Sequence, residues 1–342
     1  MAADPAGPQR PLRVLSRRSD LARAQARQVT AGLGVPVDLV ALATTGDLHP
    51  ERAIAAFDTK GLFVDTIRRS LLEGAGDVAV HSCKDLPTDP VEGLVIAAVP
   101  LRANPADVLV TRSGLGLADL PRGATVGTSS ARRRVQVHAR RPDLDIREVR
   151  GNVPTRLGRV AQGALDAVVL AAAGLDRLTA EGATLPTGLG ITALSTEECL
   201  PCPAQGALAL ECRAEDAATR ALLAAVQDPA SRAAVDAERA LLAAVEGGCS
   251  TPVGALAHVG AELALEGMLV DGAGTPVRRR ASGSDPVELG RALGRTLVAA
   301  TAGAGGGSAD APSGRPPVQP LLQPRPPQDH PPPPDPPSGA RR

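Results

Sequence analysis

Three apolar segments alternate with helical stretches in the first hundred residues, and this alternation constrains the fold more than any other feature. Residues 12–15, 37–43 and 77–80 are typical of buried strands. Ser19 is a suitable N-cap for a helix that runs to about Leu33, and another helix ends at Glu73. Strands that alternate with helices predict a mostly parallel sheet with helical cover, so we expect an α/β fold.

The same alternation recurs further along the chain. Strands are predicted at 107–111, 124–127 and 167–171, with a helix at 131–140. An apolar strand at 208–212 stands apart from its neighbours and is a candidate to complete an earlier sheet. Two helices, three strands and a helix then predict a separate α+β unit.

Composition narrows the class of protein further. The 342 residues carry no net charge, which argues against a general polyanion binder, and Lys60 and Lys84 are the only lysines. No secretory segment precedes Pro11 and no apolar run has membrane length, so we expect a cytoplasmic protein with reduced thiols. Residues 303–342 are rich in Gly, Ser and Pro and are predicted to be disordered.

The predicted strand at 77–80 runs into the polar segment His81-Ser82-Cys83-Lys84-Asp85. Ligands of open α/β sheets bind at the carboxyl edge of the strands. If this segment stays extended, Lys84 and Asp85 point to opposite faces and need not neutralise each other. On these residues alone, a catalytic carboxylate beside a binding cation and a surface ion pair are equal alternatives.

Basic residues recur where predicted strands lead into helices. Thr128, Ser129 and Ser130 precede a helix that begins with Arg132 and Arg133 among its first residues, and helix N-termini favour anions. Small carboxylates or phosphates are favoured as ligands over nucleic acid, since no aromatic residues interleave. Similar junctions contain further basic and hydroxyl residues, which predict a cleft between two α/β units for a ligand with several carboxylates: Arg17, Ser19, Arg150, Arg156 and Arg177.

Two cysteine motifs differ in their context. Cys249 follows two glycines and precedes Ser-Thr-Pro, which predicts an exposed loop that presents a thiol as a nucleophile or attachment point. A buried cysteine used for packing is the alternative. Cys199 and Cys202 form a CxxC motif without a second pair, so metal or redox use is disfavoured and no metal site is predicted.

Four ordered motifs resemble those of the porphobilinogen deaminase (hydroxymethylbilane synthase) family. They are His81–Thr88, Gly127–Arg133, Arg150–Arg156 and the Glu-Gly-Gly-Cys that ends at Cys249. The resemblance implies two type II periplasmic-binding-protein-like α/β domains around a cleft, and a third, smaller α+β domain. The implied boundaries are 12–104 with 200–216, then 105–199, then 217–302, with the tail from 303 to 342 outside the match.

The resemblance also implies the chemistry. Members of the family join four porphobilinogen molecules head to tail, with loss of ammonia, on a dipyrromethane cofactor that would be attached through Cys249. Asp85 matches the catalytic carboxylate. The residues that match cofactor or substrate contacts are Arg17, Ser19, Lys60, Ser82, Lys84, Thr128, Ser129, Arg132, Arg133, Arg150, Arg156, Arg177 and Gln205. The family analogy implies a cytoplasmic monomer of haem biosynthesis that binds neither nucleic acid nor a membrane.

Several residues depart from the family pattern. Ala204 stands where a glycine is usual, Pro154 takes a position often held by glycine, and Asp65-Thr66 replaces a common Lys-Glu pair. The alternative function is a non-catalytic, two-lobed binding protein for small polycarboxylate anions. Such a protein would need neither the Cys249 thiol nor a third domain.

Overall fold

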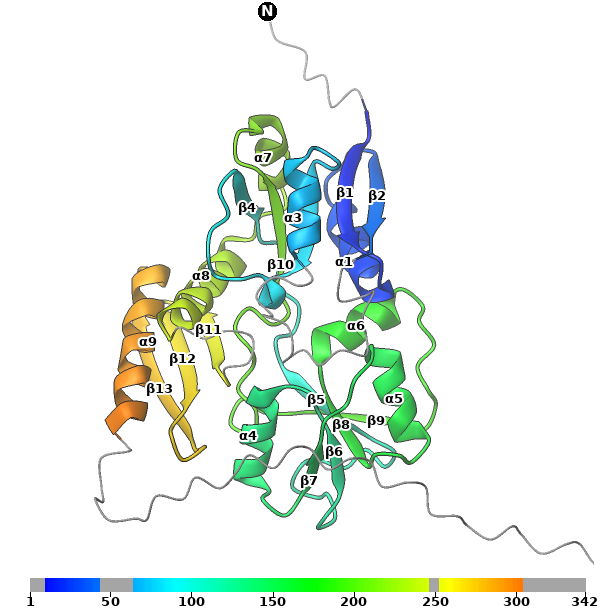
Figure 1. Cartoon of the computed structure of the whole chain (residues 1–342), viewed down its shortest axis with the longest axis vertical. Coiled ribbons are helices and arrows are strands. Elements are labelled where there is room, and N and C mark those ends of the chain that lie inside the picture. Colours follow the sequence, from blue (N-terminus) through cyan, green and yellow to red (C-terminus); the bar gives the residue numbers. More distant parts are fainter. Residues whose placement is uncertain (1–9, 44–63, 246–251, 304–342) are drawn as a thin grey trace, which may run out of the picture. The chain divides into compact units, whose positions relative to one another are not determined.

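The first sheet of the computed structural model has five strands in the order β2-β1-β3-β10-β4 (Figure 1). The structure describes residues 10–43, 64–245 and 252–303. Strands β1 and β2 and strands β1 and β3 pair in parallel, whereas β10 is antiparallel to both of its neighbours. The strands are β1 (Leu12–Arg17), β2 (Val37–Leu42), β3 (Val78–Ser82), β4 (Leu94–Ala98) and β10 (Leu208–Arg213).

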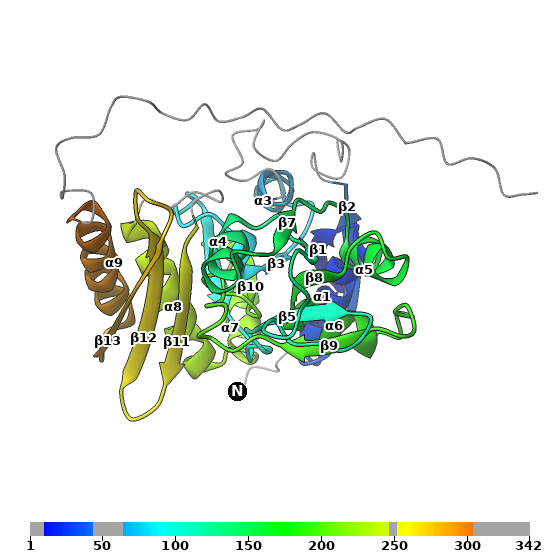
Figure 2. The ribbon, with the colours of Figure 1, turned by 90° about the horizontal axis from the view of Figure 1, so that it is seen from below.

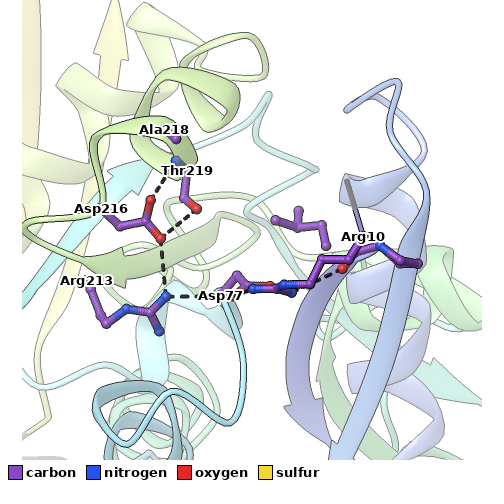
Figure 3. Close-up of a pocket in the computed structure, with 8 residues that line it drawn as sticks. Arg10, Asp77, Arg213, Asp216, Ala218 and Thr219 are labelled. Carbon is purple, nitrogen blue, oxygen red and sulfur yellow. Dashed lines mark hydrogen bonds and ion pairs between the residues drawn. The ribbon is translucent and has the colours of Figure 1, made fainter. Parts of the chain in front are cut away.

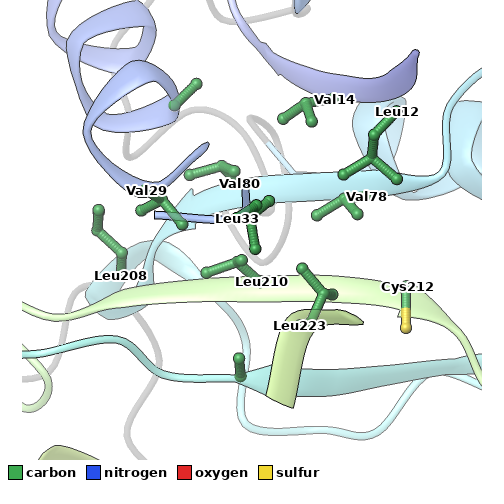
Figure 4. Close-up of a cluster of buried hydrophobic side chains, with 12 residues drawn as sticks. Leu12, Val14, Val29, Leu33, Val78, Val80, Leu208, Leu210, Cys212 and Leu223 are labelled. Carbon is green, nitrogen blue, oxygen red and sulfur yellow. The ribbon is translucent and has the colours of Figure 1, made fainter. Parts of the chain in front are cut away.

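Helices cover both faces of this sheet because consecutive residues of its strands are apolar and point to opposite faces. Helices α1 (Asp20–Thr30) and α7 (Ala217–Ala224) place Val29 and Leu223 in a buried cluster with Val14, Val78 and Leu210 (Figure 4). Helix α3 (Asp65–Leu72) contributes to a second cluster with Leu15 and Ala79. The Ser19 hydroxyl accepts a hydrogen bond from the Ala22 N–H, as predicted for the N-cap of α1.

The second sheet repeats the design of the first, in the order β7-β6-β8-β5-β9. Here β5 is the one antiparallel strand, in the fourth position that β10 holds in the first sheet. The elements are β5 (Asp107–Thr111), β6 (Thr125–Gly127), β7 (Asp145–Arg147), β8 (Ala167–Ala171) and β9 (Gly190–Ala193), with α4 (Ala131–Arg140), α5 (Val153–Ala161) and α6 (Ala172–Ala180). Pro154 lies in the first turn of α5, where its missing N–H costs no helical bond.

The third unit packs two helices on an antiparallel three-stranded sheet (Figure 2). A side chain in place of Gly290 or Gly294 would collide with the backbone or a methyl group of α8, so these glycines let α8 and α9 approach closely. The elements are α8 (Pro229–Ala244), β11 (Gly254–Val259), β12 (Leu263–Val270), β13 (Pro276–Gly283) and α9 (Pro286–Gly303).

The predicted α/β class, with a separate α+β unit, is confirmed. Strand β10 does return to the first sheet, as the isolated apolar run at 208–212 suggested. Strand β9 was not predicted, since its sequence Gly-Ile-Thr-Ala has little apolar pattern. The domain boundaries stay a prediction, and the tail from residue 304 onward lies outside the described residues.

A buried ion cluster joins α3 to strands β3 and β10. Arg68 donates two hydrogen bonds to Glu211, with N–O distances of 2.9 and 2.7 Å, and His81 Nε2 lies 3.2 Å from the same carboxylate. Burial alone would raise the pKa of Glu211, but the neighbouring His81 and the hydrogen bonds from Arg68 outweigh it and lower the pKa to about 2.

Because that pKa lies below its ordinary value of 4.5, the Glu211 carboxylate adds stability above pH 4.5 that is lost as the pH falls toward 2. Glu211→Gln should therefore lower the free energy of unfolding at pH 7 and flatten its acid decline. Urea unfolding at several pH values checks this. Asp20→Asn, in an exposed pair with Arg23, should change stability by less than about 1 kcal/mol. An unchanged pH slope in Glu211→Gln would contradict the assignment.

Candidate functional site

The segment with Asp85 forms a tight turn rather than a continued strand. Strand β3 ends at Ser82, and residues Cys83–Asp85 make a 3₁₀ turn closed by the Leu86 N–H on the Cys83 carbonyl, at 3.1 Å. The expectation that Lys84 and Asp85 alternate across a strand is therefore wrong. Asp85 is exposed, whereas the Cys83 side chain is buried and its N–H bonds the Ala207 carbonyl.

Lys84 connects this turn to the second sheet through Gln205. Its Nζ lies 3.4 Å from Gln205 Oε1, and Gln205 Nε2 donates to Asp107 Oδ1 at 2.9 Å. Burial lowers the pKa of Lys84, and the charge of Asp85 opposes that effect. The structure thus brings together Lys84 and Gln205, two predicted site residues that lie 121 residues apart in the sequence.

Ser82 is hydrogen-bonded to a side chain of α1. Its hydroxyl exchanges hydrogen bonds with the amide of buried Gln25, at 2.8 and 3.1 Å. Gln25 was missed by the sequence analysis, although a glutamine on the apolar face of a predicted helix is a usable signal. The pairing fixes the residue two positions before Lys84.

Arg132 and Arg133 are both buried and share one carboxylate. Arg132 Nη1 lies 2.7 Å from Asp107 Oδ2, and Arg133 Nη2 lies 2.7 Å from Asp107 Oδ1. The two positive charges outweigh burial and lower the pKa of Asp107, while Asp107 in turn outweighs burial and raises the pKa of Arg132. One negative charge for two cations leaves this cluster net positive, and contact of either arginine with a ligand stays a prediction.

Asp107 was also missed by the sequence analysis, although it is the one acidic residue of an otherwise apolar strand. Asp107→Asn should lower the free energy of unfolding by about 3–5 kcal/mol, because two buried guanidiniums would lose their counter-charge. Urea denaturation measures this. Asp143→Asn, which breaks a less buried pair with Arg141, is the matched control and should cost much less. Equal losses in both variants would show that burial of the Asp107 cluster does not increase its contribution to the free energy of unfolding.

The three residues before α4 differ in role and exposure. Ser130 is the N-cap, since its hydroxyl accepts from the Arg133 N–H, and buried Thr128 accepts from the Ser130 N–H at 3.2 Å. Ser129 is exposed between them. The predicted cap at 128–130 is confirmed, and Ser129 is the residue of the three that remains open to a ligand.

Two arginines of the second α/β unit have no ion pair among the described residues. Arg177 is 8% exposed, and its guanidinium donates to Gln28 Oε1 at 2.9 Å and the Gly206 carbonyl at 2.8 Å. Burial lowers its pKa to about 10, against the charge of Asp176. Arg156 donates to the Gly151 carbonyl, and burial and then the charge of Arg133 lower its pKa. Desolvated cations of this kind favour an anionic ligand.

The remaining predicted residues are placed as follows. Arg17 ends β1 and is half-buried, and Ser19 caps α1. Arg150 lies within 3.0 Å of Glu148. Lys60 and Cys249 lie outside the described residues.

The CxxC motif takes part in packing. The Cys199 thiol donates to Asp107 Oδ2 at 3.2 Å, and burial raises its pKa to about 12. Burial also raises the pKa of the Cys202 thiol. Within the described residues, no three His, Cys, Asp or Glu side chains are grouped to hold a metal ion.

A pocket of about 610 Å³ lies at the other end of β3, where Asp77 precedes the strand (Figure 3). Asp77 accepts two hydrogen bonds from Arg10, at 2.7 and 2.8 Å, and Arg213 lies 3.2 Å from Asp216. The charged side chains that line this pocket are therefore paired with one another.

Two models of one protein family match most of the chain. The family model described as "Porphobilinogen deaminase, dipyromethane cofactor binding domain" matches residues 12–221, and the C-terminal domain model of the same family matches 233–299. Porphobilinogen deaminase of Acidothermus cellulolyticus is 47% identical over 306 residues, covering 85% of this chain and 89% of that protein. The enzyme of Moorella thermoacetica is 46% identical over 316 residues, covering 89% and 98%.

Solved structures give only distant likenesses. An ancestral arginine-binding protein bound to arginine has a TM-score of 0.34 and 17% identity, covering 63% of this chain and 90% of that one. Similarity at this level establishes no shared ligand. The matches to family models and sequences, in contrast, span both α/β units and the third unit: the chain belongs to the porphobilinogen deaminase family.

Proposed function

We propose that the chain joins four porphobilinogen molecules head to tail, each with loss of ammonia, into the linear tetrapyrrole hydroxymethylbilane. The observation that carries this proposal is the group of cations without ion-pair partners among the described residues, Lys84, Arg156 and Arg177, in a family whose substrate has two carboxylates on every pyrrole. A growing chain of such rings accumulates negative charge, and desolvated guanidiniums bind carboxylates strongly.

The donor set suits the dipyrromethane cofactor of the family. Amine, guanidinium and hydroxyl groups can each hold an acetate or propionate, and the net positive cluster around Asp107 adds a favourable field. When bound, dipyrromethane supplies the covalently held pyrrole to which incoming substrate is joined. We assign its attachment to Cys249. We assign its carboxylates, and those of the substrate, to Arg17, Ser19, Lys60, Ser82, Lys84, Thr128, Ser129, Arg132, Arg133, Arg150, Arg156, Arg177 and Gln205.

Asp85 is assigned the catalytic role. Positive charge develops on the porphobilinogen ring system as ammonia departs, and a carboxylate near the pyrrole N–H stabilises that charge. The same carboxylate can accept a proton as the ring regains aromaticity. Its exposure on a turn fixed by backbone hydrogen bonds fits a group that meets successive substrates.

The fold suggests how one carboxylate serves every addition. We propose a cleft between the two α/β units and hinge motion of these units as the product grows. We place the boundaries at 12–104 with 200–216, 105–199 and 217–302. We further propose a cytoplasmic monomer. No described helix combines the length and apolar character needed to span a membrane.

A turnover assay tests the proposal. Purified protein incubated with porphobilinogen should release four ammonia molecules for each tetrapyrrole formed. Saturable porphobilinogen binding without ammonia would instead support a non-catalytic polycarboxylate-binding protein. Tight, salt-dependent binding to a duplex oligonucleotide, without turnover, would support a nucleic-acid binder.

A further inference from the structure

Arg239 of α8 holds the turn that carries Asp85. Its Nη1 donates to the Leu86 carbonyl at 3.0 Å and its Nη2 donates to the Pro87 carbonyl at 2.7 Å. One guanidinium thus binds the carbonyls of the two residues that follow Asp85. Arg239 is half-buried and has no ion pair among the described residues.

The same guanidinium also acts at the beginning of the turn. Burial raises the pKa of Cys83 to about 11, and the positive charge of Arg239 is the largest effect that opposes the rise. Arg239 therefore bonds the two residues after Asp85, and its charge also acts on Cys83 before Lys84. The turn also has two backbone hydrogen bonds, from the Cys83 N–H to the Ala207 carbonyl and from the Leu86 N–H to the Cys83 carbonyl. Pro87 offers no N–H, so its only backbone polar group is the carbonyl that Arg239 holds.

Arg239 joins the catalytic turn to the third unit. Helix α8 also carries Glu238, which accepts hydrogen bonds from Arg102 at 2.7 and 2.9 Å and from the Ala204 N–H at 2.6 Å. Arg102 and Ala204 lie on the two chain segments that connect the α/β units. Consecutive residues of α8 therefore hold the connections between those units and the turn that bears Asp85.

We propose that Arg239 is a positioning residue for Asp85, which rests on the catalytic role assigned to Asp85 above. By clamping the carbonyls after Asp85, it sets where the carboxylate lies relative to the substrate. Misplacement of a catalytic group by about 1 Å costs on the order of 100-fold in rate. A planar fork can hold two carbonyls at once, whereas a lysine ammonium presents a single point of charge.

The competing explanation is that Arg239 only docks α8 on the first α/β unit. Arg232 on the same helix provides a matched control. It donates to the Ile96 carbonyl at 3.1 Å and pairs with Asp236 at 2.8 Å, so it also ties α8 to the first unit. Arg232 does not contact the turn at residues 83–87 in the described structure.

Kinetics of Arg239→Met, Arg239→Lys and Arg232→Met test the proposal. Arg239→Met should lower kcat by about 30- to 100-fold with KM within about twofold, because carboxylate binding is kept while Asp85 is misplaced. Arg239→Lys should recover part of kcat. Arg232→Met should keep kcat and KM and lose only stability. All three should retain the covalent adduct mass of the wild type.

Hydrogen exchange gives a readout that does not depend on turnover. The Leu86 amide should exchange faster in Arg239→Met than in wild type and stay protected in Arg232→Met. Equal kcat and equal Leu86 protection in the two Met variants would overturn the proposal. If Arg239→Met does not fold, wild-type kcat and protection in Arg239→Lys would overturn it. Wild-type turnover in Asp85→Asn would instead refute the role of Asp85. The Leu86 exchange rate in Arg239→Met would then decide whether Arg239 holds the turn.

Discussion

Asp85→Asn should reduce kcat by about 10²- to 10⁴-fold, the range that proton transfer by a positioned group supplies. The amide has nearly the same shape but can neither accept a proton nor balance positive charge on the substrate. Because Asp85 is exposed, its replacement leaves the core intact. Steady-state turnover of porphobilinogen, with the melting temperature as a check on folding, measures the effect.

Asp89→Asn is the matched control for this prediction. Asp89 is exposed and four residues further along the same polar segment, so it shares the charge change without the proposed role. It should keep turnover within about twofold of the wild type, as exposed surface substitutions usually leave a fold undisturbed. Comparable losses in both variants would mean that general charge, rather than Asp85, carries the effect.

Cys249→Ser should eliminate the covalent adduct and reduce turnover to the limit of detection. A serine hydroxyl is a far weaker nucleophile than a thiolate, so it cannot form the proposed thioether. The protein should still fold. Turnover and thermal unfolding of the purified variant check both statements.

Cys212→Ala is the control for loss of a thiol as such. Cys212 is buried in the first core cluster, so the variant should melt at a lower temperature yet keep its turnover. Turnover in Cys249→Ser that equals the wild type would remove Cys249 from the attachment role.

Local signals allowed much of the framework to be predicted. Ser19 and Ser130 cap their helices because a side-chain oxygen can satisfy an N–H two or three positions away, which the sequence alone reveals. Strand β10 was found as an apolar run, and its place in the first sheet followed from its isolation and the family resemblance.

Partners that are distant in sequence could not be predicted in the same way. Asp107 meets Arg132 and Arg133 only because β5 and α4 pack together, and Gln25 meets Ser82 only because α1 lies over β3. The turn at Cys83–Asp85 was wrongly predicted as extended, since the pattern of a strand does not reveal where it bends.

Ala204 shows how tertiary contacts can hold a residue in an unfavourable backbone conformation. It is the one residue other than glycine with a positive φ, 60°, in the described chain. That conformation costs alanine about 1–2 kcal/mol. The bond from its N–H to buried Glu238 and the burial of its methyl group hold it there. Its neighbour Gln205 contacts Lys84.

The intact mass of the purified wild-type protein tests the central claim most directly. After expression in cells that make porphobilinogen, the mass should exceed that of the bare polypeptide by two pyrrole units, and Cys249→Ser should show the bare mass. A wild-type protein with the mass of the polypeptide alone would contradict the account.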